Sequence, residues 1–432
     1  MEIAVHQVLA SLGYGDAIGH EVLAIQRVLR AAGYRSDIFV ETVGPRIKEA
    51  TVDYLELQEA SHPDNILIHH FSIASRSSRI AYALPDRMIL VYHNITPPQY
   101  FVDVHPTLVQ QCFVGRRELA LYANRCELAL GDSEYNRQEL EAAGFARTDV
   151  LPVVPDFSHL SATSDSMDVR AFDDEWVNLL FVGRVIPNKC FDDLIRWFQA
   201  YKRWFNPRSR LLLVGSQAGF ENYVAMLHEF IARLGTPDVH FLGHVSNEEL
   251  VAYYDIADVF VCASEHEGFC VPLIEAFHMG VPVIAYAAAA VPSTLDGGGV
   301  LITDKNPASV AAIIHAVVTS QGLQDRILDS QDAALARLAA KDFAGTLLRF
   351  VAQVERAPRV THPPIAFDFW EQLEQAKRLA DIRAYRPAAF QALLTGAHQG
   401  GGDDRQGVDV RDAPESETET ETETETERRE ER

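Results

Sequence analysis

The 432-residue sequence has few cysteines, and their positions argue against covalent or metal cross-links. There are five, an odd number, scattered without a C-x-x-C pair: Cys112, Cys126, Cys190, Cys262 and Cys270. A disulfide framework needs paired cysteines, and a structural zinc site needs closely spaced ligands. We therefore predict reduced thiols and a cytoplasmic location.

Long apolar runs and an excess of positive charge are also lacking. No apolar stretch approaches the roughly 18 residues that a membrane-spanning helix requires. The N-terminal residues M-E-I-A-V-H-Q-V-L predict a strand and not a signal peptide. The formal net charge of −23 opposes binding to nucleic acid, which needs clustered cations. A local basic face could still contact anionic lipid, so we expect at most peripheral contact with the inner face of the cell membrane.

The pattern that the sequence does contain is an alternation of short apolar strands with amphipathic helices, repeated in two units. The first unit covers residues 1–157, a polar linker follows over 158–175, and the second unit covers 176–345. This alternation predicts an α/β protein with two Rossmann-like doubly wound domains that face a central cleft. A helical return segment is predicted over 346–397, and a disordered acidic tail over 398–432.

The most informative stretch is Ser264–Ile284, S-E-H-E-G-F-C-V-P-L-I-E-A-F-H-M-G-V-P-V-I. It follows an apolar strand, Asp258–Cys262, and a short helix is predicted to begin near Pro272, which suits a first helical turn. Unpaired N–H groups and a partial positive charge at that helix terminus favour a phosphate. Glu267 and Glu275 could accept hydrogen bonds from sugar hydroxyls beside it. Two solvated glutamates are the alternative interpretation.

A second motif, F-V-G-R followed by N-K, comes directly after a predicted strand, Val177–Val182. Arg184 and Lys189 stand five positions apart on the loop that opens the next helix, so together they could bind two oxygens of a diphosphate. Lys189 is one of only six lysines in the chain. A solvated loop carrying two cations is the alternative.

Two further positions follow predicted strands in the first unit. Gly15 belongs to the stretch G-Y-G-D-A-I-G-H, where glycine lets a backbone approach a ligand closely, although a tight turn explains it equally well. His93 stands at the carboxyl end of the predicted strand Arg87–Tyr92 and would point into the cleft. A structural histidine is the alternative there.

Taken together, these motifs resemble the retaining glycosyltransferases of the two-Rossmann-domain (GT-B) type, family 4, also called group 1. The resemblance rests on F-V-G-R…N-K (181–189), on the run A-D-V-F-V-C-A-S-E-H-E-G-F-C-V-P-L-I-E-A-F (257–277), on the N-terminal glycine loop and on D-S-E-Y-N-R (132–137). It implies transfer of a hexose from GDP-mannose or a UDP-sugar to a glycan or lipid-linked acceptor, with retention of anomeric configuration, in polysaccharide biosynthesis. It implies no metal and no cofactor besides the nucleotide-sugar co-substrate. A nucleotide-sugar 2-epimerase of the same fold and a non-catalytic sugar-binding relative are the alternatives.

The resemblance also implies roles for the motif residues. His93 and Glu267 are implied as catalytic residues that contact the transferred sugar, and Glu275 would hold the ribose. Arg184 and Lys189 would neutralise the donor diphosphate, while backbone N–H groups at the helix terminus receive a phosphate. The implied donor-binding residues are Gly15, Arg184, Lys189, Val245, Gly268, Phe269, Cys270, Val271 and Glu275.

Overall fold

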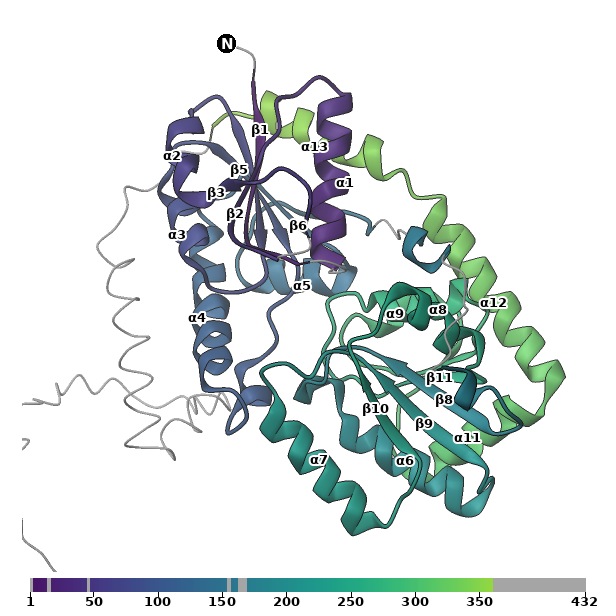
Figure 1. Cartoon of the computed structure of the whole chain (residues 1–432). Coiled ribbons are helices and arrows are strands. Elements are labelled where there is room, and N and C mark those ends of the chain that lie inside the picture. Colours follow the sequence, from purple (N-terminus) through teal and green to yellow (C-terminus); the bar gives the residue numbers. More distant parts are fainter. Residues whose placement is uncertain (1–2, 14–16, 45–46, 154–156, 162–168, 360–432) are drawn as a thin grey trace, which may run out of the picture.

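The computed structural model describes residues 3–13, 17–44, 47–153, 157–161 and 169–359. Gly15, the tail predicted over 398–432 and all but the first part of the predicted return segment lie outside the described residues. Figure 1 shows two lobes, each built on one sheet. Every helix of the described ranges is too short or too polar to cross a bilayer.

The first domain is built on a seven-stranded parallel sheet in the order β3-β2-β1-β4-β5-β6-β7. Strands β4 and β5 are buried along their whole length, because helices cover both faces of a parallel sheet. The strands are β1 (Val5–Leu12), β2 (Ile38–Val43), β3 (Val52–Asp53), β4 (Ile66–Phe71), β5 (Arg87–Tyr92), β6 (Leu128–Gly131) and β7 (Thr148–Val150). The helices are α1 (Ala17–Ala31), α2 (Leu57–Ala60), α3 (Arg76–Ala83), α4 (Pro106–Tyr122) and α5 (Glu134–Ala142), with 3-10 turns η1 (Tyr54–Glu56) and η2 (Pro98–Phe101).

The second domain is built on a six-stranded parallel sheet in the order β10-β9-β8-β11-β12-β13. Its strands are β8 (Val177–Val182), β9 (Ser209–Val214), β10 (Val239–Gly243), β11 (Val259–Cys262), β12 (Val283–Tyr286) and β13 (Val300–Ile302). Its helices are α6 (Phe191–Trp204), α7 (Glu221–Leu234), α8 (Asn247–Asp255), α9 (Val271–His278), α10 (Val291–Leu295), α11 (Pro307–Thr319) and α12 (Gln321–Ala339), with η5 (Pro187–Lys189). The predicted pair of Rossmann-like doubly wound domains is therefore confirmed.

The predicted linker and return segment both contact the folded domains. In the described part of the linker lie two 3-10 turns, η3 (Ser158–Ser161) and η4 (Val169–Phe172). Helix α13 (Phe343–Arg356) lies beside α1 on the first domain (Figure 1). Its apolar face packs into that domain's core through Leu347, Phe350, Val351 and Val354.

Local sequence signals explain where several helices begin. The Ser246 side chain accepts a hydrogen bond from the Glu249 amide, and the Glu249 carboxylate accepts one from the Ser246 amide, so the two residues form a capping box at the start of α8. The side chains of Ser133 and Asn306 cap α5 and α11 in the same way, by accepting hydrogen bonds from backbone amides of the first turn. Within the described residues, helix α1 covers Ala17–Ala31 and includes the buried Gly19.

Candidate functional site

The candidate site in the second domain lies where its strand order reverses. Strands β8 and β11 are neighbours in the sheet, and their outer neighbours, β9 and β12, continue in opposite directions. Ligands of doubly wound sheets bind outside the carboxyl ends of the strands at such a point. The loops that follow β8 and β11 contact each other here: the Glu265 amide donates to the Asn188 carbonyl at 2.9 Å, and Asn188 Nδ2 donates to the His266 carbonyl at 2.9 Å.

Helix α9 begins in this loop pair and leaves several amide groups unused. Within the described ranges, the backbone N–H groups of Gly268, Phe269, Cys270 and Val271 have no hydrogen-bond partner. Cys270 adopts a left-handed conformation with φ of 75°, and no side chain caps the helix. Four consecutive free donors at the positive end of a helix dipole form a site suited to an anion.

Lys189 and Glu267 form a largely buried ion pair beside these amides. Lys189 Nζ lies 2.5 Å from Glu267 Oε1, and the side chains are 14% and 8% exposed. Burial acts to lower the pKa of Lys189, but the charge and the hydrogen bond of Glu267, together with Cys262 and Cys270, outweigh burial and raise that pKa overall. Lys189 therefore stays positively charged, and its ammonium is already positioned by a carboxylate before any ligand arrives.

Arg184, the other predicted cation of this loop, has a different environment. It is exposed, its guanidinium lies over the Phe220 ring at 5.1 Å from the centroid, and Nη2 donates to the Ala218 carbonyl at 3.3 Å. The structure thus positions Lys189 through a charge pair and Arg184 through an aromatic face and one carbonyl. Joint binding of a diphosphate by these two residues stays a prediction.

Both carboxylate oxygens of Glu275 are hydrogen-bonded in this structure. Oε1 lies 3.0 Å from His159 Nε2, and Oε2 accepts from the Tyr254 hydroxyl at 3.1 Å. His159 lies on η3 in the predicted linker, so the linker reaches the helix that carries Glu275. A ribose hydroxyl at Glu275 would have to replace one of these two partners, and His159 is the one outside the core of the second domain.

His93 lies at the end of β5 with its imidazole directed into the first domain. Nε2 lies 2.9 Å from His70 Nδ1, and Nδ1 lies 3.3 Å from Asp132 Oδ2 and 3.7 Å from Glu21 Oε2. The His93 side chain is only 1% exposed. The predicted contact between His93 and the transferred sugar stays a prediction. Both ring nitrogens face groups of the first domain.

The motif D-S-E-Y-N-R fixes the backbone beside His93. Asn136 Nδ2 donates to Asp132 Oδ1 at 2.6 Å and to the Tyr92 carbonyl at 3.3 Å. Asn94 Nδ2 donates to Asn136 Oδ1 at 2.7 Å, and Asn94 has a positive φ of 71°. These bonds hold residues 92–94 in one conformation at the carboxyl end of the sheet.

The two halves of the site contact each other directly. A Cβ placed on Gly268 would lie 2.9 Å from the His93 carbonyl oxygen and 3.0 Å from Asn94 Cβ, so only glycine fits between the domains there. The Tyr100 hydroxyl donates to Glu265 Oε2 at 3.2 Å across the same boundary. Burial, followed by the charge of Arg116, lowers the pKa of the neighbouring His266 to about 4. The glutamate loop of the second domain therefore contacts the His93 segment of the first.

Three groups of side chains in the described ranges bring three potential metal-ligand atoms within 4.8 Å of one another. They are Cys262–Glu267–Cys270, Glu21–His93–Asp132 and Cys190–Asp193–Glu265. In the first group Glu267 is paired with Lys189, and in the third Glu265 is paired with Lys305. Activity without a metal stays a prediction.

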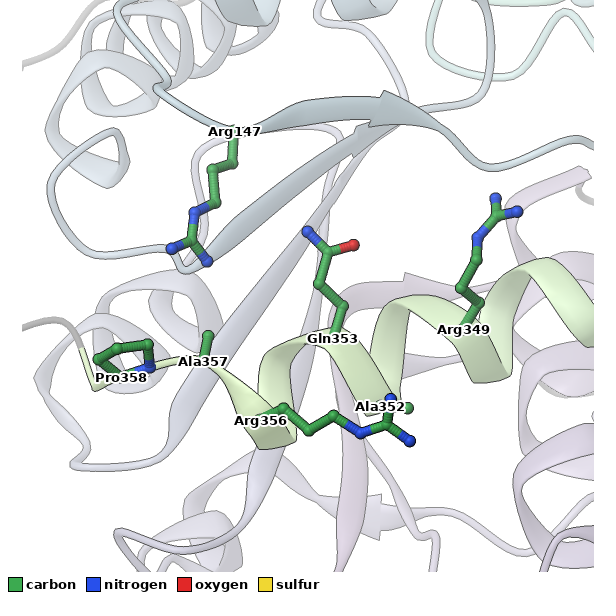
Figure 2. Close-up of a pocket in the computed structure, with 7 residues that line it drawn as sticks. All are labelled: Arg147, Arg349, Ala352, Gln353, Arg356, Ala357 and Pro358. Carbon is green, nitrogen blue, oxygen red and sulfur yellow. The ribbon is translucent and has the colours of Figure 1, made fainter.

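A separate cavity lies elsewhere, between the chain before β7 and helix α13. It has a volume of about 690 Å³, and Figure 2 shows Arg147 facing α13, on which Arg349 and Arg356 lie. None of these three arginines forms an ion pair within the described ranges. This cavity lies on the first domain near the end of α13 and contains no predicted site residue.

Sequence reasoning found the second-domain part of this arrangement and missed much of the first-domain part. Gly15 lies outside the described residues. Val245, implied to pack the nucleotide base, lies half-buried after β10, and no contact tests that role. The missed residues are Gln7, Glu21, His70, Asp132, Asn136, His159 and Tyr254. Asp132 and Asn136 stand in the motif D-S-E-Y-N-R, which was the available signal, whereas the others stand in no motif.

In a comparison with protein-family sequence models, residues 164–330 match the family described as Glycosyl transferases group 1. Over 156 residues the chain is 33% identical to a D-inositol 3-phosphate glycosyltransferase of Streptomyces bingchenggensis, covering 34% of either protein. Over 146 residues it is 32% identical to the O-antigen chain mannosyltransferase B of Escherichia coli, covering 34% of this chain and 36% of that one. The matches thus span about a third of the length of these two curated relatives.

Solved structures match most of the chain at low sequence identity. Sucrose-phosphate synthase from Thermosynechococcus elongatus and Anabaena HepE in complex with UDP-glucose each have a TM-score of 0.62, at 18% and 19% identity, covering 82% of this chain and 99% of theirs. WaaG, a glycosyltransferase involved in lipopolysaccharide biosynthesis, has a TM-score of 0.57 at 12% identity, with coverage of 82% and 100%. At these identities the likeness concerns the fold alone. The second domain therefore has the sequence pattern of the group 1 glycosyl transferases, in a chain with the GT-B fold.

Proposed function

We propose that this protein is a retaining hexosyltransferase that moves a hexose from a nucleotide-diphosphate sugar to a glycan or lipid-linked acceptor. The observation that carries the proposal is the run of four unpaired amides at the start of α9, beside the Lys189–Glu267 pair. This arrangement lies inside the segment that matches the group 1 family. A bound donor presents a diphosphate, and the free amides and Lys189 supply the positive field for it.

The chemistry requires that negative charge developing on the leaving diphosphate be stabilised. Amides that are fixed before reaction do this without reorganisation, and such preorganised donors each contribute about 3 kcal/mol in well-studied enzymes. Glu275 then accepts hydrogen bonds from the ribose, and Glu267 accepts from a hydroxyl of the transferred sugar while it orients Lys189. We propose that no metal takes part, because these groups supply the charge that a metal would.

Retention is proposed as a front-face transfer in which the leaving phosphate helps to deprotonate the acceptor. Among the described residues near Gly268, we assign none as a covalent nucleophile. Product made from a donor of known anomeric configuration is examined by NMR. An inverted product would overturn this part of the proposal and leave the transferase assignment intact.

The donor is proposed as GDP-mannose or a UDP-sugar. One relative is named a mannosyltransferase, and one solved structure of the same fold was determined with UDP-glucose. Both candidates are tested by thermal shift of the purified chain, because a ligand of the folded state raises its stability by mass action. Glu275→Gln should abolish the shift, whereas the exposed Glu229→Gln should preserve it.

The same assay separates the alternatives. Release of a free sugar epimer and UDP from a UDP-sugar without any acceptor would favour the 2-epimerase. Donor binding with neither hydrolysis nor transfer to a panel of glycan acceptors would favour a non-catalytic relative.

We also propose peripheral contact with an anionic membrane through the arginines in Figure 2, Arg147, Arg349 and Arg356. All three are exposed, and each cation near an anionic surface contributes on the order of 1 kcal/mol. Replacing all three with alanine should reduce co-sedimentation with phosphatidylglycerol vesicles, while phosphatidylcholine vesicles bind neither protein. Equal binding by the variant would reject this surface. The matched control replaces three exposed arginines of the second domain, Arg208, Arg233 and Arg326.

A further inference from the structure

A line of three buried side chains joins β1, β4 and the end of β5 beneath the candidate site. His70 Nε2 lies 2.9 Å from Gln7 Oε1, and His70 Nδ1 lies 2.9 Å from His93 Nε2. Gln7 and His70 are 0% and 2% exposed, and the planes of the two imidazole rings are nearly parallel, with an angle of 11° between them and centroids 5.2 Å apart. Because these side chains are buried, each donor in the line should face an acceptor.

The hydrogen bond that Gln7 makes to the backbone determines which atom donates in each of the other hydrogen bonds of this line. Gln7 Nε2 donates to the Val22 carbonyl at 3.0 Å, which fixes the amide so that Oε1 faces His70. An amide oxygen only accepts, so His70 carries its proton on Nε2. Burial holds the pKa of His70 well below its ordinary value, so His70 stays neutral and its Nδ1 is bare. The remaining bond must therefore run from His93 Nε2–H to His70 Nδ1.

One form of His93 is excluded by this geometry. A neutral ring protonated on Nδ1 would place two lone pairs, on His93 Nε2 and His70 Nδ1, against each other at 2.9 Å. We propose that Gln7 and His70 are positioning residues that keep a proton on His93 Nε2 in every charge state, so that His93 gains or loses a proton through Nδ1 alone.

The groups that face Nδ1 give this restriction a consequence. Asp132 lies 3.3 Å away and Glu21 3.7 Å away, and Glu21 Oε1 has no partner within the described ranges. Burial raises the pKa of Glu21 to about 7, although the charge of His93 partly opposes this. The Nδ1 side of His93 therefore faces two carboxylates, whereas its Nε2 side faces His70.

The functional part of this inference rests on the proposed transferase activity. The carbonyl of His93 contacts the loop of Gly268, so the ring lies directly behind the point where donor and first domain meet. Charge separates there as the sugar leaves the diphosphate, and the charge of His93 affects that step. If His93 could adopt the other neutral tautomer, its Nδ1 would carry the proton and donate toward Asp132 while the ring had no positive charge.

The test uses the full chain labelled with ¹⁵N-histidine, in which two-bond ¹H–¹⁵N spectra distinguish protonated from bare ring nitrogens. Signals of His93 are assigned by their absence in His93→Gln. At every pH at which the chain stays folded, His93 Nε2 should be protonated, and any change of protonation should appear at Nδ1. A neutral His93 with a bare Nε2 in the wild-type protein overturns the proposal, whatever the enzyme does.

Variants of His70 provide the second arm. His70→Asn places an amide oxygen where Nδ1 was and should preserve the wild-type pattern, whereas His70→Leu removes the acceptor and should release both tautomers. His69→Leu is the matched control, because His69 is an equally buried neighbour on β4 that bonds Ser78 instead, at 3.0 Å. An unchanged His93 spectrum in His70→Leu overturns the proposal, as does an equal change in His69→Leu.

Kinetics with the donor found by thermal shift give the third arm. Outer partners of metal-ligating histidines contribute about 10- to 100-fold, and by the same orienting effect His70→Leu should lower kcat by about tenfold or more with KM unchanged. His70→Asn should restore kcat. If no transferase activity exists in the wild type, the proposed function fails while the spectra still decide the tautomer. If His70→Leu does not fold, the wild-type and His70→Asn spectra decide it.

Discussion

Replacing Lys189 with methionine removes one charge of the buried pair and keeps most of the side-chain volume. Glu267 would then remain 8% exposed without the ammonium that lies 2.5 Å from it. Removing one partner of a buried ion pair destabilises a protein by about 3–5 kcal/mol, because the other charge is left uncompensated. For a domain of this size, each kcal/mol lowers the melting temperature by about 2–4 °C, so Lys189→Met should lower it by roughly 6–20 °C.

The assay is calorimetric melting of four proteins: wild type, Lys189→Met, Glu267→Gln and the double variant. The double variant has no unpaired charge, so it should be more stable than Lys189→Met, with a coupling energy of roughly 1–3 kcal/mol between the two sites. Lys341→Met is the matched control, since Lys341 is exposed and its loss should change stability by less than about 0.5 kcal/mol.

Two results would refute this reasoning. If Lys189→Met and Lys341→Met have the same melting temperature, the loss of the Lys189 charge does not leave Glu267 as an uncompensated buried charge. If the single effects simply add in the double variant, Lys189 and Glu267 do not interact in solution. A donor-induced rise in melting temperature that survives in Lys189→Met would separately remove Lys189 from diphosphate binding.

Two further predictions concern the boundary between the domains and the first-domain carboxylates. Gly268→Ala should lower the free energy of unfolding by roughly 1–3 kcal/mol and separate the domains, because the new methyl overlaps the His93 carbonyl. Small-angle scattering should show a larger radius of gyration, and activity should fall. Gly322→Ala is the control: it has open space around it and should leave the radius of gyration and the activity unchanged. The pKa of Glu21 rises on folding from 4.5 to about 7, so the folded state holds the extra proton and stability should fall as pH rises through this window, by up to roughly 3 kcal/mol. Urea unfolding at both ends of the window should show this loss in wild type and not in Glu21→Gln; an equal loss in the variant would contradict the assignment.

Much of the fold followed from the sequence, because strands and helices with strong periodicity are local features. The strands Val177–Val182 and Arg87–Tyr92 have the bounds that their apolar patterns predict. Helix α12 was not predicted, since its one buried stripe is short and includes a glutamine, Gln331. That glutamine bonds the backbone at Val281 and Val283, a tertiary contact that no local pattern encodes.

In the candidate site, too, some residues could be predicted from local motifs, whereas the contacts between them could not. Lys189 and Glu267 stand in motifs whose residue types indicate phosphate and sugar chemistry, and the structure brings them together. Sequence could not reveal that they pair with each other, because they are separated by 78 positions. Likewise, nothing local marks Gln7 or His70: a polar residue inside an apolar strand shows its role only when the partner strand and its register are known.

The return of α13 to the first sheet makes the first domain discontinuous along the chain. In effect, the second domain is an insertion between β7 and α13, and the core that contains Val5 and Ile66 is completed only by the last described helix. A chain truncated after Lys341 would therefore damage the domain farthest from the cut in sequence, by exposing that core. The insertion also joins the domains by two backbone crossings instead of one, so a hinge motion must change dihedral angles at both crossings together.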